Sequence, residues 1–483
     1  MFDLRPVLFA NGLLLLVLAV AMGAALGLDL AVAGGEAPAF AASMFATAFA
    51  GGALALTGRG RGGFGLGGRQ AFLFSASGTL LCSLFAALPL ILGARHLRFI
   101  DALFEAISGI TTTGATVLTD LDHAPAALLL WRALLQWLGG AGVIVAAVLL
   151  LPMLRIGGMQ VFRMEYSSTS GEKVPRKLPR LLGKLMALYG GATLLLAIAL
   201  RAADMNWLEA TCHAMASIST GGFSTSDQSL GKFGEAARWI CVAGMLLGGM
   251  NLALFISPWR GKRWRIARDT QVRWYGLTAL IFALLLSFWH WAVEGMPGGN
   301  AFQRGVFQSV SLLTTTGFRD AEDHGWGGFP QVAIFVMAFI GGCTGSAAGG
   351  IKIFRYEVLF AVSRLHVARM LHPHGVFFAT FNRLRLPEAV LRSVLGFFML
   401  YFVCFAVLST ALAVTGLDPL SSLSAAAAAM GNIGRGVGPV IGMAGGYHAL
   451  PDAAKLLLAL GMLLGRLELA PLLVLLLPSF WKD

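Results

Sequence analysis

A short glycine-centred motif occurs four times in this chain, and the apolar segments around each copy restrict how the chain can fold. The copies are Ile110–Thr116, Ile218–Ser224, Leu313–Arg319 and Met430–Gly436, each with glycine at its fifth position. A motif that recurs at roughly 100-residue spacing indicates an internal repeat. We therefore expect four copies of one structural unit whose motifs meet at a common axis.

The composition predicts a membrane protein. Of 483 residues, 57% are hydrophobic and 12% are charged, whereas soluble domains carry about 25% charged residues. So many apolar residues indicate several membrane-spanning helices. The net charge of +12 is typical of nucleic-acid binding, but the Lys and Arg residues lie in short loops, as expected for cytoplasmic loops. We expect no nucleic-acid partner.

Each expected repeat contains a spanning helix, a short amphipathic helix, the motif and a second spanning helix. The short segments are too brief to cross roughly 30 Å of hydrocarbon, so they are expected to be re-entrant half-helices. They lie at 100–112, 206–219, 301–315 and 419–431. The paired spans are expected at 71–94 and 127–152, 181–203 and 234–257, 271–294 and 331–370, and 389–415 and 452–478. With two N-terminal helices at 7–28 and 38–56, the predicted fold class is an all-α polytopic membrane protein with four pseudo-symmetric repeats around one pore.

The same pattern divides the chain and orients it. We expect N-terminal helices in 1–68 and pore repeats in 69–156, 177–260, 269–371 and 386–483. The Lys and Arg residues between repeats place those loops and both termini in the cytoplasm. The opposite loops contain acids, which either raise the cation concentration above the motifs or only solvate the loops. They are Asp101, Glu105, Asp120, Asp122, Asp204, Glu209, Asp227, Glu235, Asp320, Glu322 and Asp323.

The motif suits the binding of a dehydrated monovalent cation. Rings of backbone carbonyls can replace the water around such an ion, glycine permits the unusual backbone this needs, and helix C-termini carry partial negative charge. Helix packing is the alternative, but it explains scattered glycines rather than a fourfold recurrence. The expected filter glycines are Gly114, Gly222, Gly317 and Gly434. The cation is expected to bind carbonyl or hydroxyl oxygens of Thr112, Thr113, Thr220, Gly221, Thr315, Thr316, Asn432 and Ile433.

Further motifs carry a resemblance to a known family. Trp131-Arg132, Gln136-Trp137-Leu138-Gly139-Gly140, the run 341–352 and Gly465-Arg466-Leu467-Glu468 accompany the four motifs. Over nearly its whole length the chain resembles the Trk/Ktr/HKT superfamily of potassium transporters, of the TrkH type. The resemblance implies potassium as the transported ion, a bacterial inner-membrane location in contact with lipid, a homodimer, and a cytosolic nucleotide-binding regulatory partner of the RCK type.

A gate is expected below the filter. The run 341–350 is rich in Gly, Ala and Ser, so it should break its helix at membrane depth. The resemblance makes it a gate containing Gly345, Gly349, Gly350 and Lys352, and it points Arg466 into the pore. The alternatives are a packing kink for the run, and an Arg466 that extends to the cytoplasmic interface. Glu468 lies two positions on and is a poor partner for Arg466.

The fourth motif departs from the family pattern. Arg435 follows its glycine where proline is usual, and Asn432 and Ile433 replace Thr or Gly. A fixed positive charge repels a cation, so we expect Arg435 to point behind the filter or into the outer vestibule. This asymmetry keeps a sodium-permeable, or sodium- or proton-coupled, transporter as an alternative. Gly114 favours potassium, because in some relatives serine replaces this glycine and the pore passes sodium.

Catalysis is not expected. The nine His residues do not cluster except at His372-Pro373-His374, where a loop turn is expected rather than a metal site, and no Walker sequence is present. The Gly-rich basic stretch at 59–63 follows no predicted strand, so we interpret it as a cytoplasmic loop. We therefore expect no enzymatic activity and no organic cofactor.

Overall fold

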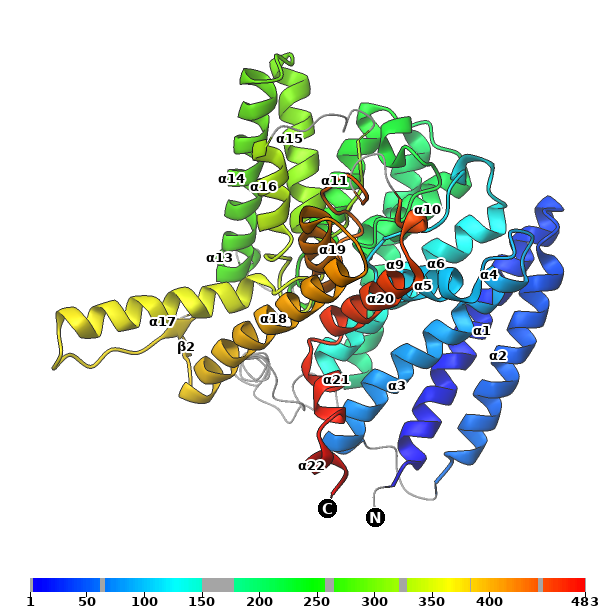
Figure 1. Cartoon of the computed structure of the whole chain (residues 1–483), viewed down its shortest axis with the longest axis horizontal. Helices are drawn as coiled ribbons and strands as arrows, with labels where there is room; N and C mark the ends of the chain where they lie inside the picture. Colours follow the sequence, from blue (N-terminus) through cyan, green and yellow to red (C-terminus); the bar gives the residue numbers. More distant parts are fainter. Residues whose placement is uncertain are drawn as a thin grey trace.

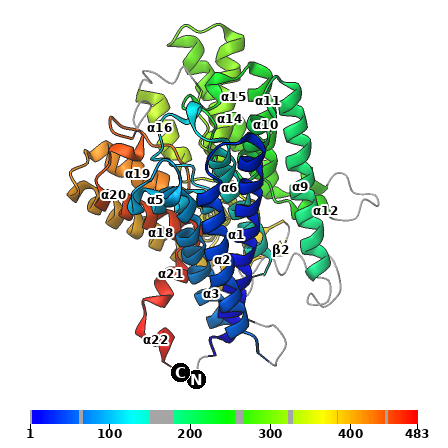
Figure 2. The ribbon, with the colours of Figure 1, turned by 90° about the vertical axis from the view of Figure 1, so that its right-hand side faces the viewer.

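The computed structural model describes residues 3–60, 66–149, 178–256, 265–320, 328–382, 384–441 and 446–482. Two N-terminal helices, α1 (Arg5–Val32) and α2 (Ala37–Thr57), form an antiparallel pair that packs against the first repeat through α1 (Figures 1 and 2). They approach closely at Gly12, where a Cβ atom would lie 2.5 Å from the backbone nitrogen of Ala55. Close approach of this kind is typical of small-residue packing between membrane helices.

The expected helix pattern is present in all four repeats. Repeat 1 contains α3 (Gly68–Ala86), α4 (Leu88–Leu92), α5 (Phe99–Ile110) and α6 (Ala126–Leu149). Repeat 2 contains α9 (Leu178–Ala202), α10 (Trp207–Ile218), α11 (Glu235–Gly248) and α12 (Ala253–Ile256). Repeat 3 contains α13 (Arg265–Arg268), α14 (Thr270–Ala292), α15 (Gly298–Leu313), α16 (Gly328–Met337) and α17 (Ile353–Leu371). Repeat 4 contains α18 (Glu388–Val414), α19 (Pro419–Gly431), α20 (Asp452–Arg466), α21 (Ala470–Leu475) and α22 (Pro478–Trp481).

Short elements join these helices. One-turn 3₁₀ helices η1 (Leu121–His123), η3 (Ser229–Lys232) and η4 (Tyr447–Ala449) follow three of the motifs. Strands β1 (Thr380–Phe381) and β2 (Leu384–Arg385) pair antiparallel between repeats 3 and 4. Helix α17 extends away from the helical body, and the hairpin packs against it (Figure 1).

The second helices of repeats 2 to 4 are interrupted, which corrects part of the prediction. Continuous helices over 234–257 and 452–478 were wrong: α11 ends at Gly248 and α20 at Arg466. Glu468 and Leu469 have positive φ values of 58° and 61°, which an α-helix cannot contain. In repeat 3, the expected break is present between α16 and α17. By contrast, α6 is continuous over its 24 residues.

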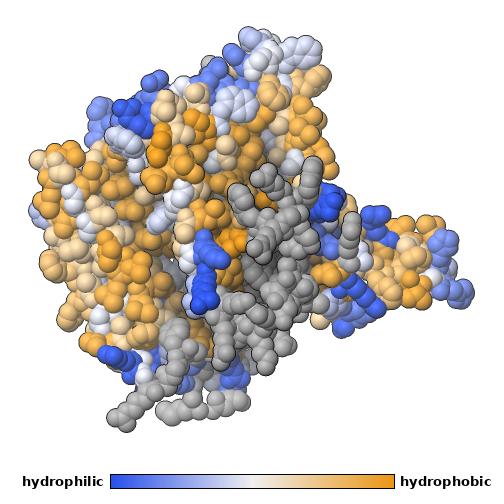
Figure 3. Space-filling model, turned by 180° about the vertical axis from the view of Figure 1, so that it is seen from behind, coloured by the Kyte–Doolittle hydropathy of each residue, from blue (hydrophilic) through white to orange (hydrophobic). Residues whose placement is uncertain are grey.

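The surface agrees with a multi-pass membrane protein. Within the described ranges, seven helices are long and apolar enough to cross a membrane, and the three interrupted second helices are the other expected spans. Apolar residues form a broad band over the body, with hydrophilic residues gathered above and below it (Figure 3). Both termini lie at the same end of the molecule (Figures 1 and 2). The inter-repeat basic residues 155–177 and 260–263, and the acids at 322 and 323, lie outside the described residues.

The half-helices are buried at the centre. In α19, Ser421, Ser422 and every residue from Ser424 to Gly431 are buried, and its run of alanines packs between α18 and α20. Small side chains permit that close approach. Local signals begin two of the half-helices: Asn206 and Glu209 form a capping box at α10, and Asp418 caps α19.

Candidate functional site

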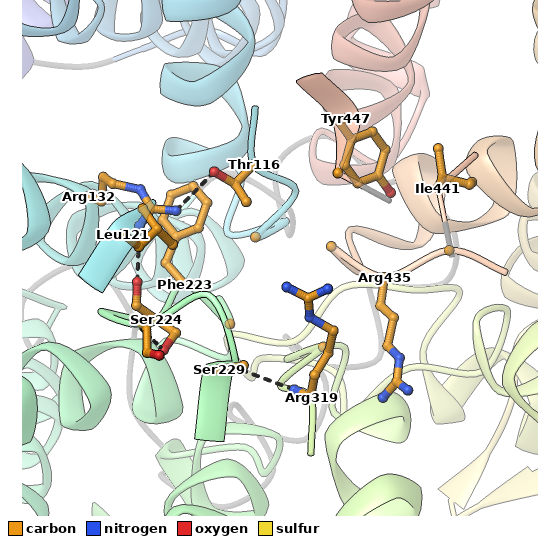
Figure 4. A pocket seen from close by; sticks show the side chains of 17 residues that line it. Thr116, Leu121, Arg132, Phe223, Ser224, Ser229, Arg319, Arg435, Ile441 and Tyr447 are labelled. Carbon is orange, nitrogen blue, oxygen red and sulfur yellow. Dashed lines mark hydrogen bonds between the residues drawn. The ribbon is translucent and has the colours of Figure 1, made fainter. Parts of the chain in front are cut away.

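The four motifs lie together. Gly114, Gly222, Gly317 and Gly434 line one pocket, here called the outer pocket (Figure 4). Each of these glycines abuts the next motif in cyclic order. A Cβ atom on Gly114 would collide with the carbonyl of Gly221, one on Gly222 with that of Thr316, and one on Gly434 with that of Gly114, while one on Gly317 would lie 3.2 Å from the nitrogen of Gly434. The repeats therefore follow one another around an axis, with repeat 1 opposite repeat 3.

The motif backbone has an unusual conformation. The third residue has positive φ in every copy: 51° at Thr112, 51° at Thr220, 59° at Thr315 and 53° at Asn432. The fifth residue also has positive φ in repeats 1 to 3, namely 83° at Gly114, 80° at Gly222 and 78° at Gly317. Left-handed residues that alternate with right-handed ones turn successive carbonyls toward one side, as a cation filter requires. Gly434 does not adopt positive φ, so the backbone conformation of the fourth motif differs from that of the other three.

The motif amides bond back to the half-helices of their own repeats. Backbone amides at the fourth motif position turn back to the half-helix: Thr113 donates to the Ser108 carbonyl, Gly221 to Ala216 and Ile433 to Ala428, each at 2.8 Å. All four half-helices, of 12, 12, 16 and 13 residues, end at their motif. Their negative C-terminal ends thus converge on the axis.

The threonine hydroxyls have different surroundings. Thr220 donates to the Ser219 carbonyl at 2.8 Å, and Thr315 accepts from the amide of Gly349 at 2.7 Å. The hydroxyls of Thr113 and Thr316 pair with those of Thr111 and Thr314 at 2.8 and 2.7 Å. The buried hydroxyl of Thr112 has no hydrogen-bond partner within the described ranges. Buried hydroxyls normally have a partner, so Thr112 is the side chain best suited to meet an ion or water.

Other predicted ligands are partly engaged. The Gly221 carbonyl accepts a 2.6 Å hydrogen bond from Nε2 of Gln136, which occupies one of its two lone pairs. The Asn432 amide group donates to Thr113 Oγ1 at 3.1 Å and to the Met462 carbonyl at 2.9 Å. Asn432 therefore turns its side chain toward α20 rather than the axis. Potassium binding by these residues stays a prediction.

The broken segment of repeat 3, residues 338–352, lies against the inner ends of the motifs; we call it the gate loop. Gly341, Gly345, Gly350 and Lys352 have positive φ values of 81°, 82°, 74° and 75°. Its amides bond to repeat 2, Cys343 to the Gly249 carbonyl at 2.9 Å and Ala347 to that of Gly248 at 3.2 Å. Gly349 bonds to Thr315, as described above, and a Cβ there would meet Asn432 at 2.9 Å. The gate loop thus contacts motifs 3 and 4 and the repeat 2 helix end.

Arg466 reaches the gate loop. Its Nη1 donates to the Ala347 carbonyl at 2.8 Å, and the residue is 9% exposed. The alternative that Arg466 extends to the interface is therefore wrong. Glu468 does not partner it, as expected; its carboxylate lies 2.5 Å from Nη2 of Arg355 and 3.7 Å from Nζ of Lys352.

The outer pocket is basic rather than acidic. Its walls include Arg132, Arg319 and Arg435, and no Asp or Glu lines it in the part of the chain that the structure describes. Several predicted vestibule acids instead pair with cations, Asp101 with Lys455 at 2.6 Å and Asp320 with Arg238 at 3.1 Å. The expectation of an acidic vestibule is wrong for these walls. Arg435 forms part of the pocket wall, and its side chain extends away from the pocket centre, whereas that of Arg319 turns toward it (Figure 4).

A charged cluster joins the outer loops of repeats 1 and 2. Lys232 lies 3.2 Å from both Asp122 and Glu209. Burial disfavours the charged carboxylate of Asp122, but hydrogen bonds from Lys232, the Asp227 amide and Ser226 outweigh it and hold the pKa of Asp122 below its ordinary value. No group of three or more His, Cys, Asp or Glu side chains suited to a metal occurs within the described ranges.

Arg132 and Gln136 had no role predicted from the sequence, although both lie in motifs that carry the family resemblance. Both are buried on α6, at 1% and 0% exposure. The signal was present, because ionisable and amide side chains inside a spanning helix are costly and usually functional. Their partners in motif 2 lie about 90 residues further along the chain, and no periodicity indicates those contacts.

Comparisons with known proteins agree with this geometry. A family model described as TrkH, cation transport protein, matches residues 37–482. The Trk system potassium uptake protein TrkI of Halomonas elongata is 40% identical over 417 residues, which cover 86% of this chain and 84% of the relative. TrkH of Escherichia coli K12 is 36% identical over 424 residues, 86% of each chain. The crystal structure of the potassium transporter TrkH from Vibrio parahaemolyticus matches with a TM-score of 0.91 at 32% identity, covering 100% of both chains.

Proposed function

The chain belongs to the TrkH family of cation transport proteins, and from this premise we propose that it carries potassium into the cell through the four-motif filter. The observation that carries the proposal is the ring of four motifs, each at the C-terminal end of a buried half-helix. Relatives named as potassium uptake proteins support the choice of ion. Transport of this kind needs no enzymatic step and no organic cofactor.

In this proposal, potassium enters through the outer pocket and exchanges its water for protein oxygens. The ligands are those predicted above, with the unpaired hydroxyl of Thr112 and the carbonyls at the third and fourth motif positions foremost. The half-helix C-termini favour positive charge at this point. The filter glycines Gly114, Gly222 and Gly317 maintain the left-handed turns that direct the carbonyls.

The gate loop closes the path beneath the filter. Gly345, Gly349, Gly350 and Lys352 belong to the loop or its end, and Arg466 is bonded to it. Nε and Nη2 of Arg466 are buried without a hydrogen-bond partner among the described residues, which suits a guanidinium that borders a water-filled passage. Its charge repels an approaching cation. Opening then requires the loop to release the Ala347–Arg466 bond.

Further features belong to the same proposal. The location is the bacterial inner membrane, with both termini in the cytoplasm, which the positive-inside pattern and the shared position of the termini support. A homodimer and a cytosolic RCK-type regulatory partner complete it. The Trk system names of the relatives support a multicomponent assembly, and exposed Phe360, Val367 and Met370 on the projecting α17 offer an apolar surface for association. The repeat boundaries given above are part of the proposal.

Cation flux into proteoliposomes tests the function. Potassium and rubidium flux should clearly exceed sodium and lithium flux, and Gly114→Ser should lose this preference. The reason is geometric, because Gly114 has a φ of 83° and a Cβ there would collide with the Gly221 carbonyl. Equal sodium and potassium flux in the unmutated protein would refute a potassium filter.

A sodium-permeable transporter of the same fold is the second candidate. One observation favours it: Gly434 lacks the positive φ found at the other three filter glycines, so one wall of the filter directs its carbonyls differently. Under this alternative, the unmutated protein would pass sodium as fast as potassium. Gly114→Ser would leave the ratio of the two fluxes unchanged. Coupling to a sodium or proton gradient would appear as potassium flux that depends on that gradient.

A further inference from the structure

Two polar residues of α6 contact the filter motif of the neighbouring repeat. The register of the second helices is set by Gly139, Gly248 and Gly465, each of which abuts the backbone carbonyl of the first residue of its own motif. Three residues before these glycines stand Gln136, Met245 and Met462, and seven residues before them stand Arg132, Cys241 and Leu458. Repeat 1 therefore has polar side chains where repeats 2 and 4 have apolar or thiol ones.

Gln136 bonds to the filter backbone in both directions. Its Nε2 donates to the Gly221 carbonyl at 2.6 Å, and its Oε1 accepts from the Phe223 amide at 3.0 Å. The amide group thus spans Gly222, the filter glycine of motif 2. Gly221 packs so tightly on this amide that a Cβ there would collide with it. From its place on α6, Gln136 fixes the orientation of the motif 2 backbone.

Arg132 joins the ends of two motifs. Its Nη1 donates to the Ser224 carbonyl at 3.0 Å and its Nη2 to Thr116 Oγ1 at 3.1 Å, so one guanidinium holds motifs 1 and 2 together (Figure 4). Nε donates to Oε1 of Glu105 at 2.8 Å, and the guanidinium lies 4.1 Å from the ring centre of Phe223. The planar fork of arginine suits several directed bonds, which lysine cannot reproduce.

Glu105 completes the arrangement from the half-helix α5. Its Oε1 also accepts from Thr116 Oγ1 at 2.9 Å, and Oε2 accepts from the Val117 amide at 2.9 Å. Glu105 and Arg132 are 0% and 1% exposed, so both charges are compensated within the protein. We call Glu105, Arg132 and Gln136 the filter brace.

We propose that the filter brace determines potassium-over-sodium selectivity by fixing the seam between motifs 1 and 2, with Arg132 and Gln136 as positioning residues. The inference rests on the proposed function. In a filter that selects by cavity size, the carbonyls must not move inward around the smaller of two equally charged ions. Bonds from Gln136 to Gly221 and Phe223, and from Arg132 to Ser224, resist that movement.

The test compares ion preference with overall stability. Gln136→Met introduces the residue that repeats 2 and 4 carry at this position, and Arg132→Lys keeps the charge beside Glu105 but loses the fork. We expect each to lower the potassium-to-sodium flux ratio in proteoliposomes by roughly fivefold, the factor that accompanies one lost hydrogen bond. The change should come mainly from higher sodium flux. Met245→Leu, a volume-conserving change at the equivalent buried site of repeat 2, should leave the ratio unchanged.

A purely structural role predicts a different result. If Gln136→Met and Arg132→Lys lower total flux or the unfolding temperature while the flux ratio stays at the wild-type value, the proposal is overturned. Should Gln136→Met not fold, Gln136→Asn retains an amide on a shorter chain and is expected to lower the ratio in the same direction. Failure of the proposed function appears separately, as a wild-type protein that does not prefer potassium.

Discussion

Replacement of Glu468 by glutamine should destabilise the inner side of the pore. Glu468 is 6% exposed, and its carboxylate is shared by Arg355 at 2.5 Å and Lys352 at 3.7 Å. Those cations are 1% and 4% exposed. Removal of one partner from a buried ion pair costs about 3–5 kcal/mol. Glutamine retains an amide oxygen that can accept a hydrogen bond from Arg355, so we expect a loss near the lower end of this range, about 3 kcal/mol.

The loss should also alter gating, because Lys352 ends the gate loop and precedes α17. We expect Glu468→Gln to unfold several degrees below wild type in detergent, and to pass more potassium in proteoliposomes because the loop is held less firmly. Glu388→Gln is the matched control: its 3.3 Å contact with Arg392 joins side chains that are 81% and 80% exposed, and such pairs contribute about 0.3–0.5 kcal/mol. Equal unfolding temperatures for the two variants would refute the reasoning.

Three further predictions concern charge along the path. Arg466→Gln removes both the charge and the 2.8 Å bond to Ala347, so potassium flux should rise several-fold at equal protein density; unchanged flux would argue against a gate at this point. Arg435→Gln should raise flux about twofold at low ionic strength, the effect of about 0.5 kcal/mol between charges roughly 8 Å apart in water, and salt should abolish the difference. Asp122 has a depressed pKa, so its pairing with Lys232 stabilises the fold above about pH 4 and is lost as the pH falls through the folded-state value; the unfolding temperature should fall in that window, and fall less in Asp122→Asn.

Much of the fold followed from local pattern. Apolar length separated spanning helices from half-helices, and the half-helix α10 begins at the capping box formed by Asn206 and Glu209. Glycine at the fifth motif position was expected to permit an unusual backbone, and Gly114, Gly222 and Gly317 do have positive φ. The fourth copy showed the limit of the rule, because Gly434 has the same residue type without the same conformation. A motif indicates which conformations are permitted, whereas the neighbours decide which one is adopted.

Charge pairing could not be read from the sequence. The predicted vestibule acids include Asp101, whose partner Lys455 comes from the fourth repeat, and Asp320, whose partner Arg238 comes from the second. Such contacts depend on the order of the repeats around the axis. The same is true of Gln136, which bonds to a motif in another repeat. Composition of the loops therefore did not predict the electrostatics of the pore wall.

The cyclic order of the motifs gives these contacts a common logic. Repeat 1 lies opposite repeat 3, because Gly114 abuts motif 2 and motif 4 while Gly222 abuts motif 3. The second helix of repeat 1, α6, is continuous and carries Arg132 and Gln136, whereas that of repeat 3 is interrupted by the gate loop. The loop is tied directly to the filter, since the Gly349 amide donates to Thr315 at 2.7 Å. A filter in which motif 3 moves together with the gate loop can keep its geometry only if another motif is held fixed. Arg132 and Gln136 lie on the wall that is best placed to do so. The buried charge of Arg132 is compensated there by the carboxylate of Glu105.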